Sequence, residues 1–83
     1  MSYSFKFDKN AEDFLNKMQV KDSLRIIEKL EIIKQNPFHY LESYEGDYYK
    51  LRIGDYRLLI DIDFNSKILY IRVLDKRGRI YKR

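Results

Sequence analysis

The sequence predicts an α+β fold, in which a small antiparallel twisted sheet carries a two-helix hairpin on one face. Hydrophobic residues recur every three or four positions between residues 9 and 35, which is typical of amphipathic helices. From residue 48 they recur at every second position, which is typical of strands, and turn signals divide this region into three runs. With 83 residues, the chain is expected to form one domain, residues 1–83.

The first strand and the first helix are predicted from the N-terminal segment. Tyr3 to Phe7, YSFKF, alternates aromatic and polar residues, which favours a strand. Asp8 follows at a position where a carboxylate can accept the free N–H groups of a first helical turn, so we expect it to cap a helix. The apolar stripe of that helix consists of Ala11, Phe14, Leu15 and Met18.

A second helix is predicted from about Lys21 to Gln35. Pro37 disfavours helical geometry at Asn36, so the helix should end there. Because only a few residues separate the two helices, we expect an antiparallel hairpin. The segment 37–47 has no clear period and is predicted to be a loop. The apolar stripe of the second helix comprises Leu24, Ile26, Ile27, Leu30, Ile32 and Ile33.

Three antiparallel strands are predicted after residue 47. The runs YYKLRI and YRLLIDIDF flank Gly54-Asp55, and glycine can adopt the positive φ that a two-residue hairpin turn needs. Residues 65–67 form a second turn, and the last strand covers Ile68 to Asp75. Together with the N-terminal strand, this meander forms a sheet whose apolar face receives the helices.

Side-chain alternation assigns the residues of the meander to two faces. The face expected to pack on the helices carries Tyr49, Leu51, Ile53, Tyr56, Leu58, Ile60, Ile62, Leu69, Ile71 and Val73. The other face gathers Lys50, Arg52, Arg57 and Arg72, with Tyr48 and Tyr70 among them. Like charges on neighbouring strands cost stability, so this clustering favours a binding role over simple solvation.

The basic charge is concentrated in the second half of the chain. Residues 1–47 hold seven Lys/Arg and nine Asp/Glu, whereas residues 48–83 hold ten Lys/Arg and four Asp, a net charge of +6. The ending DKRGRIYKR contributes Lys76, Arg77, Arg79 and Lys82. Guanidinium groups bind phosphates through two parallel hydrogen bonds and aromatic rings stack on unpaired bases, so this pattern favours RNA as the ligand.

The composition excludes several kinds of site. The chain has no cysteine, which excludes disulfides and thiolate metal sites, and no apolar stretch approaches the roughly 18 residues of a membrane span. We therefore expect a cytoplasmic protein with no membrane partner. Its one histidine, His39, excludes a two-histidine ribonuclease mechanism. Asp61 and Asp63 are expected to pair with nearby arginines rather than hold Mg²⁺, and no glycine-rich phosphate loop is present, so no metal or other cofactor is expected.

A site made of Lys, Arg and Tyr can cleave RNA without a metal. The ribose 2′-OH attacks the adjacent phosphorus, and the transition state gathers negative charge on the non-bridging oxygens. A well-placed guanidinium group lowers that barrier by about 3 kcal/mol. A lysine crowded by other cations can serve as the general base.

Residues 49–60, YKLRIGDYRLLI, resemble the hairpin signature of the RelE-type toxins of bacterial and archaeal toxin–antitoxin systems. That signature contains a tyrosine, a basic residue, Leu, Arg, an aliphatic residue, Gly-Asp-Tyr-Arg and further aliphatic residues. The ending RGRIYKR is similar to the family's ending, an arginine followed four residues later by a tyrosine and then by a basic residue. The order of elements also agrees, so the resemblance extends over essentially the whole chain.

The resemblance implies a ribosome-dependent endoribonuclease that cleaves mRNA in the ribosomal A site by 2′-OH attack. It also implies a cognate RelB-like antitoxin that wraps around the toxin and neutralises it. Such pairs often repress their own promoter, so contact with promoter DNA is expected only for the toxin–antitoxin complex.

By position, the resemblance assigns roles to five residues. Arg57 matches the arginine that holds the scissile phosphate, and Arg77 matches a late arginine that supports the phosphate or the leaving group. Tyr81 matches the tyrosine that stacks on or orients the substrate base. Lys50 and Arg52 match basic positions of the first meander strand, and we expect Lys50 to be the general base.

Two positions depart from the family pattern. Tyr48 stands where some members carry a second lysine, and Lys76 stands where many members have a histidine. Both substitutions leave the general base open to other assignments. The residues expected to bind RNA around the catalytic group are Tyr48, Arg72, Lys76, Arg79 and Lys82.

Two alternatives keep the fold and change the activity. The ParE-like branch of the superfamily poisons DNA gyrase and lacks the phosphate-site residues, so the presence of Arg57, Arg77 and Tyr81 favours the RNA-cleaving branch. The other alternative is a catalytically inactive relative that binds RNA.

Overall fold

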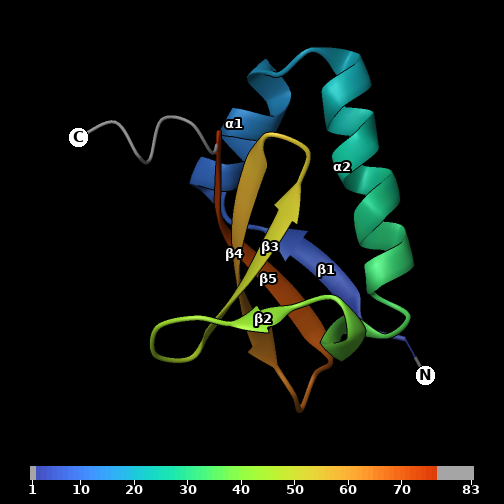
Figure 1. Ribbon diagram of the computed structural model, residues 1–83, viewed down its shortest axis with the longest axis vertical. Helices are drawn as coiled ribbons and strands as arrows, with labels where there is room; N and C mark the ends of the chain where they lie inside the picture. Colours follow the sequence, from blue (N-terminus) through green and yellow to red (C-terminus); the bar gives the residue numbers. More distant parts are fainter. Residues whose placement is uncertain (1, 77–83) are drawn as a thin grey trace.

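The computed structural model describes residues 2–76. These residues fold into two helices and a five-stranded sheet (Figure 1). The strand order is β1-β5-β4-β3-β2. This arrangement confirms the predicted α+β class. The elements are β1 (Ser4–Phe7), α1 (Lys9–Lys17), α2 (Val20–Ile33), the short 3₁₀ helix η1 (Pro37–His39), β2 (Glu42–Ser43), β3 (Tyr48–Ile53), β4 (Tyr56–Asp63) and β5 (Ile68–Lys76).

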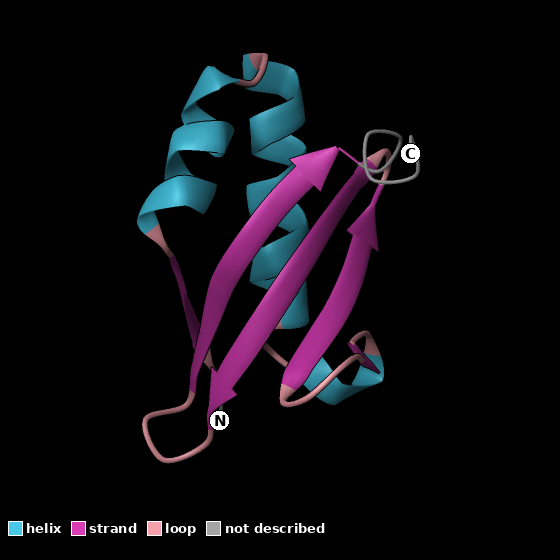
Figure 2. Cartoon of the chain, turned by 90° about the vertical axis from the view of Figure 1, so that its left-hand side faces the viewer, coloured by secondary structure: helices cyan, strands magenta, loops and turns pink. Residues whose placement is uncertain are grey.

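The helices form the predicted antiparallel hairpin and cover one face of the sheet, while the opposite face is open (Figures 1 and 2). Within residues 2–76, neither helix is long and apolar enough to cross a membrane. The core lies between the two layers. Its fully buried large side chains are Ile26, Leu30, Ile33, Leu58, Ile60, Leu69 and Ile71.

The sheet is mixed rather than purely antiparallel. β1 pairs with β5 in parallel, with Phe5 beside Leu69 and Phe7 beside Ile71, while β5, β4 and β3 form the predicted antiparallel meander. The two helices fill the long connection that a parallel pair requires. β2 adds a fifth strand by pairing with β3 inside the segment 37–47, which was wrongly predicted to be only a loop.

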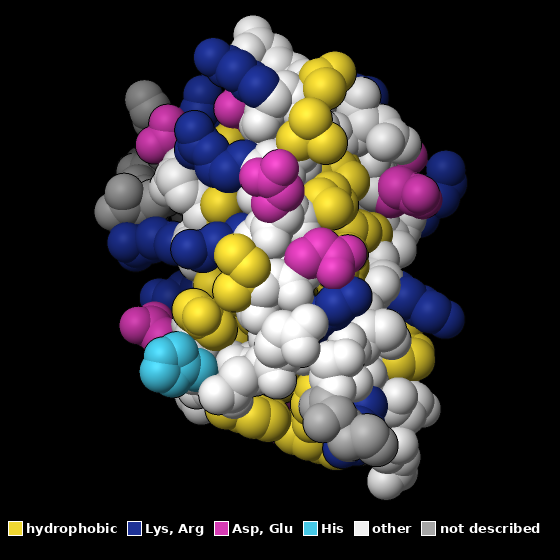
Figure 3. Space-filling model, turned by 90° about the vertical axis from the view of Figure 1, so that its right-hand side faces the viewer, with side chains coloured by type: hydrophobic (Ala, Val, Ile, Leu, Met, Phe, Trp, Pro, Cys, Tyr) yellow, Lys and Arg dark blue, Asp and Glu magenta, His cyan; other side chains and the backbone are white. Residues whose placement is uncertain are grey.

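Helix α2 has a narrower buried stripe than the sequence predicted. Ile26, Leu30 and Ile33 are fully buried, but Leu24 and Ile32 are each 53% exposed. Each exposed residue is two positions, or about 200° around the helix, from a buried one, so it cannot face the same sheet. Hydrophobic side chains accordingly form a broken band among charged ones on the side of the molecule that carries α2 (Figure 3).

A β-bulge in β5 reverses the predicted alternation at the C-terminal end of the strand. Ile60 pairs with Ile71 and Leu59 with Val73, so Arg72 is an extra residue on β5. The prediction that Val73 lies in the core was therefore wrong. Val73 is 37% exposed and Leu74 is 4% exposed.

Helix α1 starts after Asp8 as predicted, but the Asp8 side chain does not cap the first helical turn as we expected. Asp8 occupies the N-cap position in an extended conformation and makes no side-chain capping hydrogen bond. Instead its carboxylate accepts hydrogen bonds from Nη1 of Arg72 at 3.0 and 3.2 Å. The guanidinium group of Arg72 is a stronger partner than a backbone N–H because both groups of the pair are charged.

Asp63 organises the turn between β4 and β5. Its Oδ1 accepts hydrogen bonds from the backbone N–H groups of Asn65 at 3.0 Å and Ser66 at 3.2 Å, and its Oδ2 accepts one from the Ser66 hydroxyl at 3.1 Å. The bonds from Ser66, and then that from Asn65, lower the pKa of the Asp63 carboxyl because they favour its ionised form.

The free energy of unfolding should therefore fall as the pH drops below about 4, since Asp63 takes up a proton more readily in the unfolded chain. The variant Asp63→Asn keeps an oxygen acceptor but cannot titrate. We expect the urea midpoints of the wild type and this variant to differ at pH 7 and to draw together as the pH falls below about 4. A difference that stays constant over this range would contradict the assigned role of Asp63.

Candidate active site

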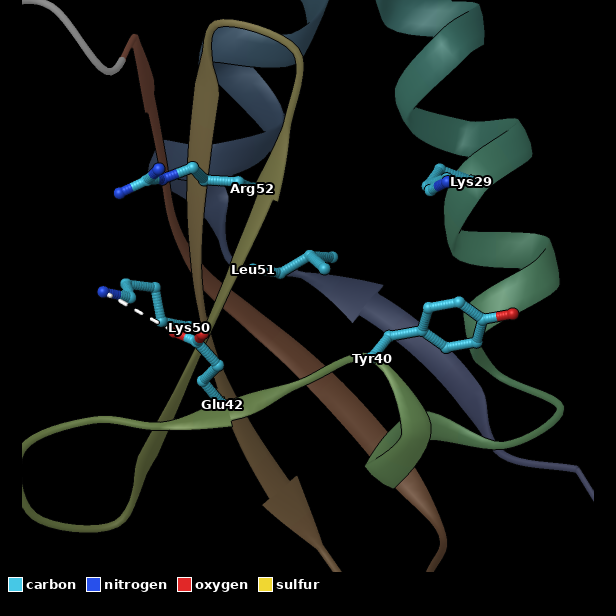
Figure 4. Close-up of a pocket in the computed structure, with 6 residues that line it drawn as sticks. All are labelled: Lys29, Tyr40, Glu42, Lys50, Leu51 and Arg52. Carbon is cyan, nitrogen blue, oxygen red and sulfur yellow. Dashed lines mark ion pairs between the residues drawn. The ribbon is translucent and has the colours of Figure 1, made fainter.

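Three of the sequence-predicted cations meet on the open face of the sheet. Arg52 on β3 and Arg57 on β4 are Cα partners, and Lys50 lies two residues earlier on β3, opposite Leu59. The Gly54-Asp55 turn, with Gly54 at φ +59°, joins the two strands directly and fixes this register. The charged ends of Lys50 and Arg52 both point away from α2 (Figure 4).

Arg52 and Arg57 both lack a carboxylate oxygen within 4.0 Å in residues 2–76, and Arg57 differs from Arg52 in having a buried guanidinium nitrogen. This nitrogen, Nε, has no hydrogen-bond partner in the same residues. Asp75 is the Cα partner of Arg57 on β5, but Oδ1 of Asp75 accepts the N–H of Lys76 at 2.8 Å. A buried donor without an acceptor costs about 1–3 kcal/mol, so an anion bound here would recover that energy.

Lys50 has one weak acidic partner and one aromatic partner. Its Nζ lies 3.8 Å from Oε1 of Glu42, which is largely exposed, so the pair contributes little to stability. The same Nζ lies 5.5 Å from the ring centroid of Tyr44. The ammonium group therefore remains available to a ligand on the open face.

Tyr44 is a site residue that the sequence analysis missed. It lies between β2 and β3, and its ring centroid is 5.8 Å from Cζ of Arg57 as well as 5.5 Å from Nζ of Lys50. The signal that could have located it is Gly46-Asp47, a turn dipeptide of the same kind as Gly54-Asp55.

Arg72, predicted to bind RNA, is held by two carboxylates. Its Nη1 donates to Asp8 at 3.0 Å, its Nη2 donates to Asp61 at 3.1 Å, and its Cζ lies 4.7 Å from the ring centroid of Tyr70. The hydrogen bonds to Asp61 and Asp8 raise the pKa of the Arg72 guanidinium above its usual value. β4 lies between Arg72 on β5 and both Lys50 and Arg52 on β3, and Arg57, which is on β4, pairs with Asp75 of β5 rather than with Arg72.

The other residues predicted to bind RNA lie at strand ends or outside the described residues. Tyr48 opens β3 and is 40% exposed, four residues or about 13 Å along the strand from Arg52. Lys76 is exposed at the end of β5. Arg77, Arg79, Tyr81 and Lys82 lie outside the described residues.

A groove of about 480 Å³ separates β3 from α2 on the other side of the strand (Figure 4). Tyr40 and Leu51 point toward α2 in this region, whereas the charged ends of Lys50 and Arg52 point the opposite way. The groove therefore shares Lys50 and Arg52 with the cation cluster, but the charged ends of these two residues lie on the opposite side of β3. Its lining consists of Lys29, Tyr40, Glu42, Lys50, Leu51 and Arg52.

No cluster of three or more His, Asp or Glu residues that could hold a metal ion occurs between residues 2 and 76. Asp61 and Asp63, the carboxylates that share a strand face, are engaged with Arg72 and with the β4–β5 turn. The pairing of Asp61 with an arginine agrees with the sequence prediction. In the part described, the groups on the open face that are not engaged with a carboxylate or a turn are mainly guanidinium, ammonium and phenol groups.

A protein-family model matches residues 5–81 of the chain. That family is described as the ParE toxin of type II toxin–antitoxin systems, parDE. A comparison with curated proteins found no significant match.

Solved structures of toxin–antitoxin complexes share the fold. The chain is 22% identical to a chain of the RelBE2 complex from Mycobacterium tuberculosis, with a TM-score of 0.83 over 93% of this chain and 100% of that one. It is 26% identical to a chain of the archaeal RelE–RelB complex from Pyrococcus horikoshii, with a TM-score of 0.76 over 95% and 99% of the two chains. The isolated RelE toxin of E. coli is 19% identical, with a TM-score of 0.76 over 90% and 84%.

Proposed function

The chain belongs to the ParE toxin family of type II toxin–antitoxin systems, within the RelE/ParE superfamily, and we propose that it acts as an RNA-cleaving toxin of that superfamily. It cleaves mRNA in the ribosomal A site by attack of a ribose 2′-OH on the adjacent phosphate. The reaction needs no metal ion, and its result is inhibition of translation in the cytoplasm.

The observation that carries this proposal is that the guanidinium group of Arg57 has no partner among the described carboxylates. This group faces the open side of the sheet, and its buried Nε has no acceptor in residues 2–76. A structural arginine would normally be paired, as Arg72 is with Asp8 and Asp61. A phosphate supplies both the charge and the planar pair of acceptors that a guanidinium fork binds best.

Lys50 and Arg52 complete the described part of the site. Arg57 and Arg52, as neighbours across the β3–β4 pair, stabilise the charge that grows on the phosphate oxygens in the transition state. Lys50 acts as the general base that removes the 2′-OH proton. Arg77 and Tyr81, which lie outside the described residues, are proposed to support the phosphate and to stack on the substrate base.

The proposed partners follow from the complexes whose chains share this fold. A RelB-like antitoxin binds the toxin and neutralises it; the matched RelBE2, RelE–RelB and RelBE structures, which are toxin–antitoxin complexes, support such a partner. The ribosome presents the mRNA. Promoter DNA is contacted only by the toxin–antitoxin complex.

A gyrase poison is the second candidate, because the matching family is named after ParE. Such a toxin has no need for an unpaired arginine beside two other cations on an open sheet face. The two candidates leave different products in the cell, so one experiment separates them.

Expression of the chain without an antitoxin should stop translation, and sequencing of mRNA 5′ ends should locate new breaks inside ribosome-protected codons. Plasmid supercoiling should stay normal in the same cells. Intact mRNA together with altered supercoiling would instead assign the chain to the gyrase-directed branch. Growth arrest with neither change would contradict both candidates.

A further inference from the structure

The hairpin that joins β2 to β3 places one aromatic ring against two cations of the candidate site. The N–H of Tyr44 donates to the carbonyl of Tyr48 at 2.8 Å, and the N–H of Tyr48 donates to the carbonyl of Glu45 at 3.2 Å. Gly46 closes the turn at φ +61°, a conformation that other residues rarely adopt. The backbone on both sides of Tyr44 is therefore hydrogen-bonded.

The ring of Tyr44 lies within cation–π distance of two side chains that come from different strands. The centroid is 5.5 Å from Nζ of Lys50 on β3 and 5.8 Å from Cζ of Arg57 on β4. Two like charges this close to one ring would repel each other in its absence. The negative face of the ring offsets part of that repulsion.

An aromatic partner differs from a carboxylate partner in what it leaves free. The carboxylates of Asp8 and Asp61 occupy the N–H donors of Arg72. A ring contact occupies no N–H donor, so the donors of Lys50 and Arg57 stay available to an incoming anion. It also restricts long side chains that would otherwise lose rotamer freedom when the anion binds.

We propose that Tyr44 is a positioning residue that holds Lys50 and Arg57 in the arrangement that binds a phosphate group. The proposal rests on the proposed function, in that the phosphate would be the scissile one of an RNA. Tyr44 acts through the two cations and takes no part in proton transfer.

The test measures phosphate binding directly and needs neither RNA nor ribosomes. Inorganic phosphate is titrated into the isotopically labelled full chain, and the Nε–H signal of Arg57 is followed by NMR. Loss of two cation–π contacts predicts that Tyr44→Leu binds phosphate about tenfold more weakly. Its Arg57 signal should also lose the ring-current shift present in the wild type.

Three further variants make the result specific to the ring. Tyr44→Phe keeps the ring and should bind within about twofold of the wild type, since the cation–π contact does not need the hydroxyl. Tyr40→Leu is the matched control, because Tyr40 points toward α2 on the other side of β3 (Figure 4). Gly46→Ala strains the turn that carries Tyr44 without a clash, since no atom lies within 4 Å of the added Cβ, and should weaken binding in the same direction.

The inference would be overturned by phosphate binding by Tyr44→Leu that equals the wild type, or by no phosphate binding at Arg57 in the wild type. A loss in Tyr44→Phe as large as that in Tyr44→Leu would also overturn it. If the wild type binds phosphate through Arg57 but cuts no mRNA, the proposed function fails while the role of Tyr44 in holding the two cations stands.

Discussion

Replacing Arg57 by alanine is expected to abolish toxicity and to slow cleavage of ribosome-bound mRNA by about 10²- to 10³-fold, the usual effect of removing one preorganised donor to a charged transition state. Single-turnover cleavage on purified ribosomes measures this loss. Arg57→Lys should be intermediate, because lysine keeps the positive charge but lacks the two-pronged geometry of the guanidinium group.

The variant Arg57→Ala should be at least as stable as the wild type. Arg57 has a buried Nε with no hydrogen-bond partner and lies opposite Arg52, so its removal eliminates an unsatisfied donor and a like-charge pair. We expect the thermal midpoint of Arg57→Ala to equal or exceed that of the wild type. Lys21→Ala in the first turn of α2 removes an exposed cation from the helix layer and is the control, which should keep full activity.

Cleavage at the wild-type rate by Arg57→Ala would refute the site assignment. A loss of activity that accompanies a large fall in the thermal midpoint would mean that Arg57 supports the fold instead. The combination of lost activity with unchanged stability is specific to a functional arginine.

The second large effect concerns the bulge in β5. Leu74→Ala should reduce the free energy of unfolding by about 2–5 kcal/mol, because Leu74 is 4% exposed and its truncation leaves a cavity. Val73→Ala should cost less than about 1 kcal/mol, because Val73 is 37% exposed. Urea denaturation measures both variants.

Uninterrupted alternation along β5 predicts the reverse order, with Val73 in the core and Leu74 outside. Equal losses in the two variants, or a larger loss in Val73→Ala, would therefore contradict the bulge at Arg72. A loss as large as that expected for Leu74→Ala is a considerable part of the stability of a domain of this size.

Short-range patterns predicted most of the fold. The helical period located α1 and α2, the two-residue alternation located β3, β4 and the first half of β5, and Gly54-Asp55 located the hairpin that brings Arg52 opposite Arg57. These features depend on interactions between residues close in sequence, whose spacing is visible in the chain. Alternation alone therefore assigns Lys50, Arg52 and Arg57 to one face of the sheet.

Long-range contacts decided what the patterns could not. Alternation in β5 continues in sequence past Ile71, but pairing with β4 inserts Arg72 as a bulge, and its guanidinium group then meets Asp61 on β4 and Asp8 at the start of α1. Asp8 and Arg72 are 64 residues apart in sequence. No local sequence pattern predicts that the carboxylate of Asp8 will pair with an arginine that far along the chain.

By itself, the sequence determined the α+β class, the two hairpins and a basic face with Lys50, Arg52 and Arg57, because periodicity and turn chemistry act over a few residues. Only the tertiary structure decided which cations are free. It neutralises Arg72 between two carboxylates, leaves Arg57 without one in the described residues, and brings Tyr44 against both Lys50 and Arg57. The reason is physical: the charge state of a surface depends on which groups from distant strands come within a few ångströms, and strand pairing determines that.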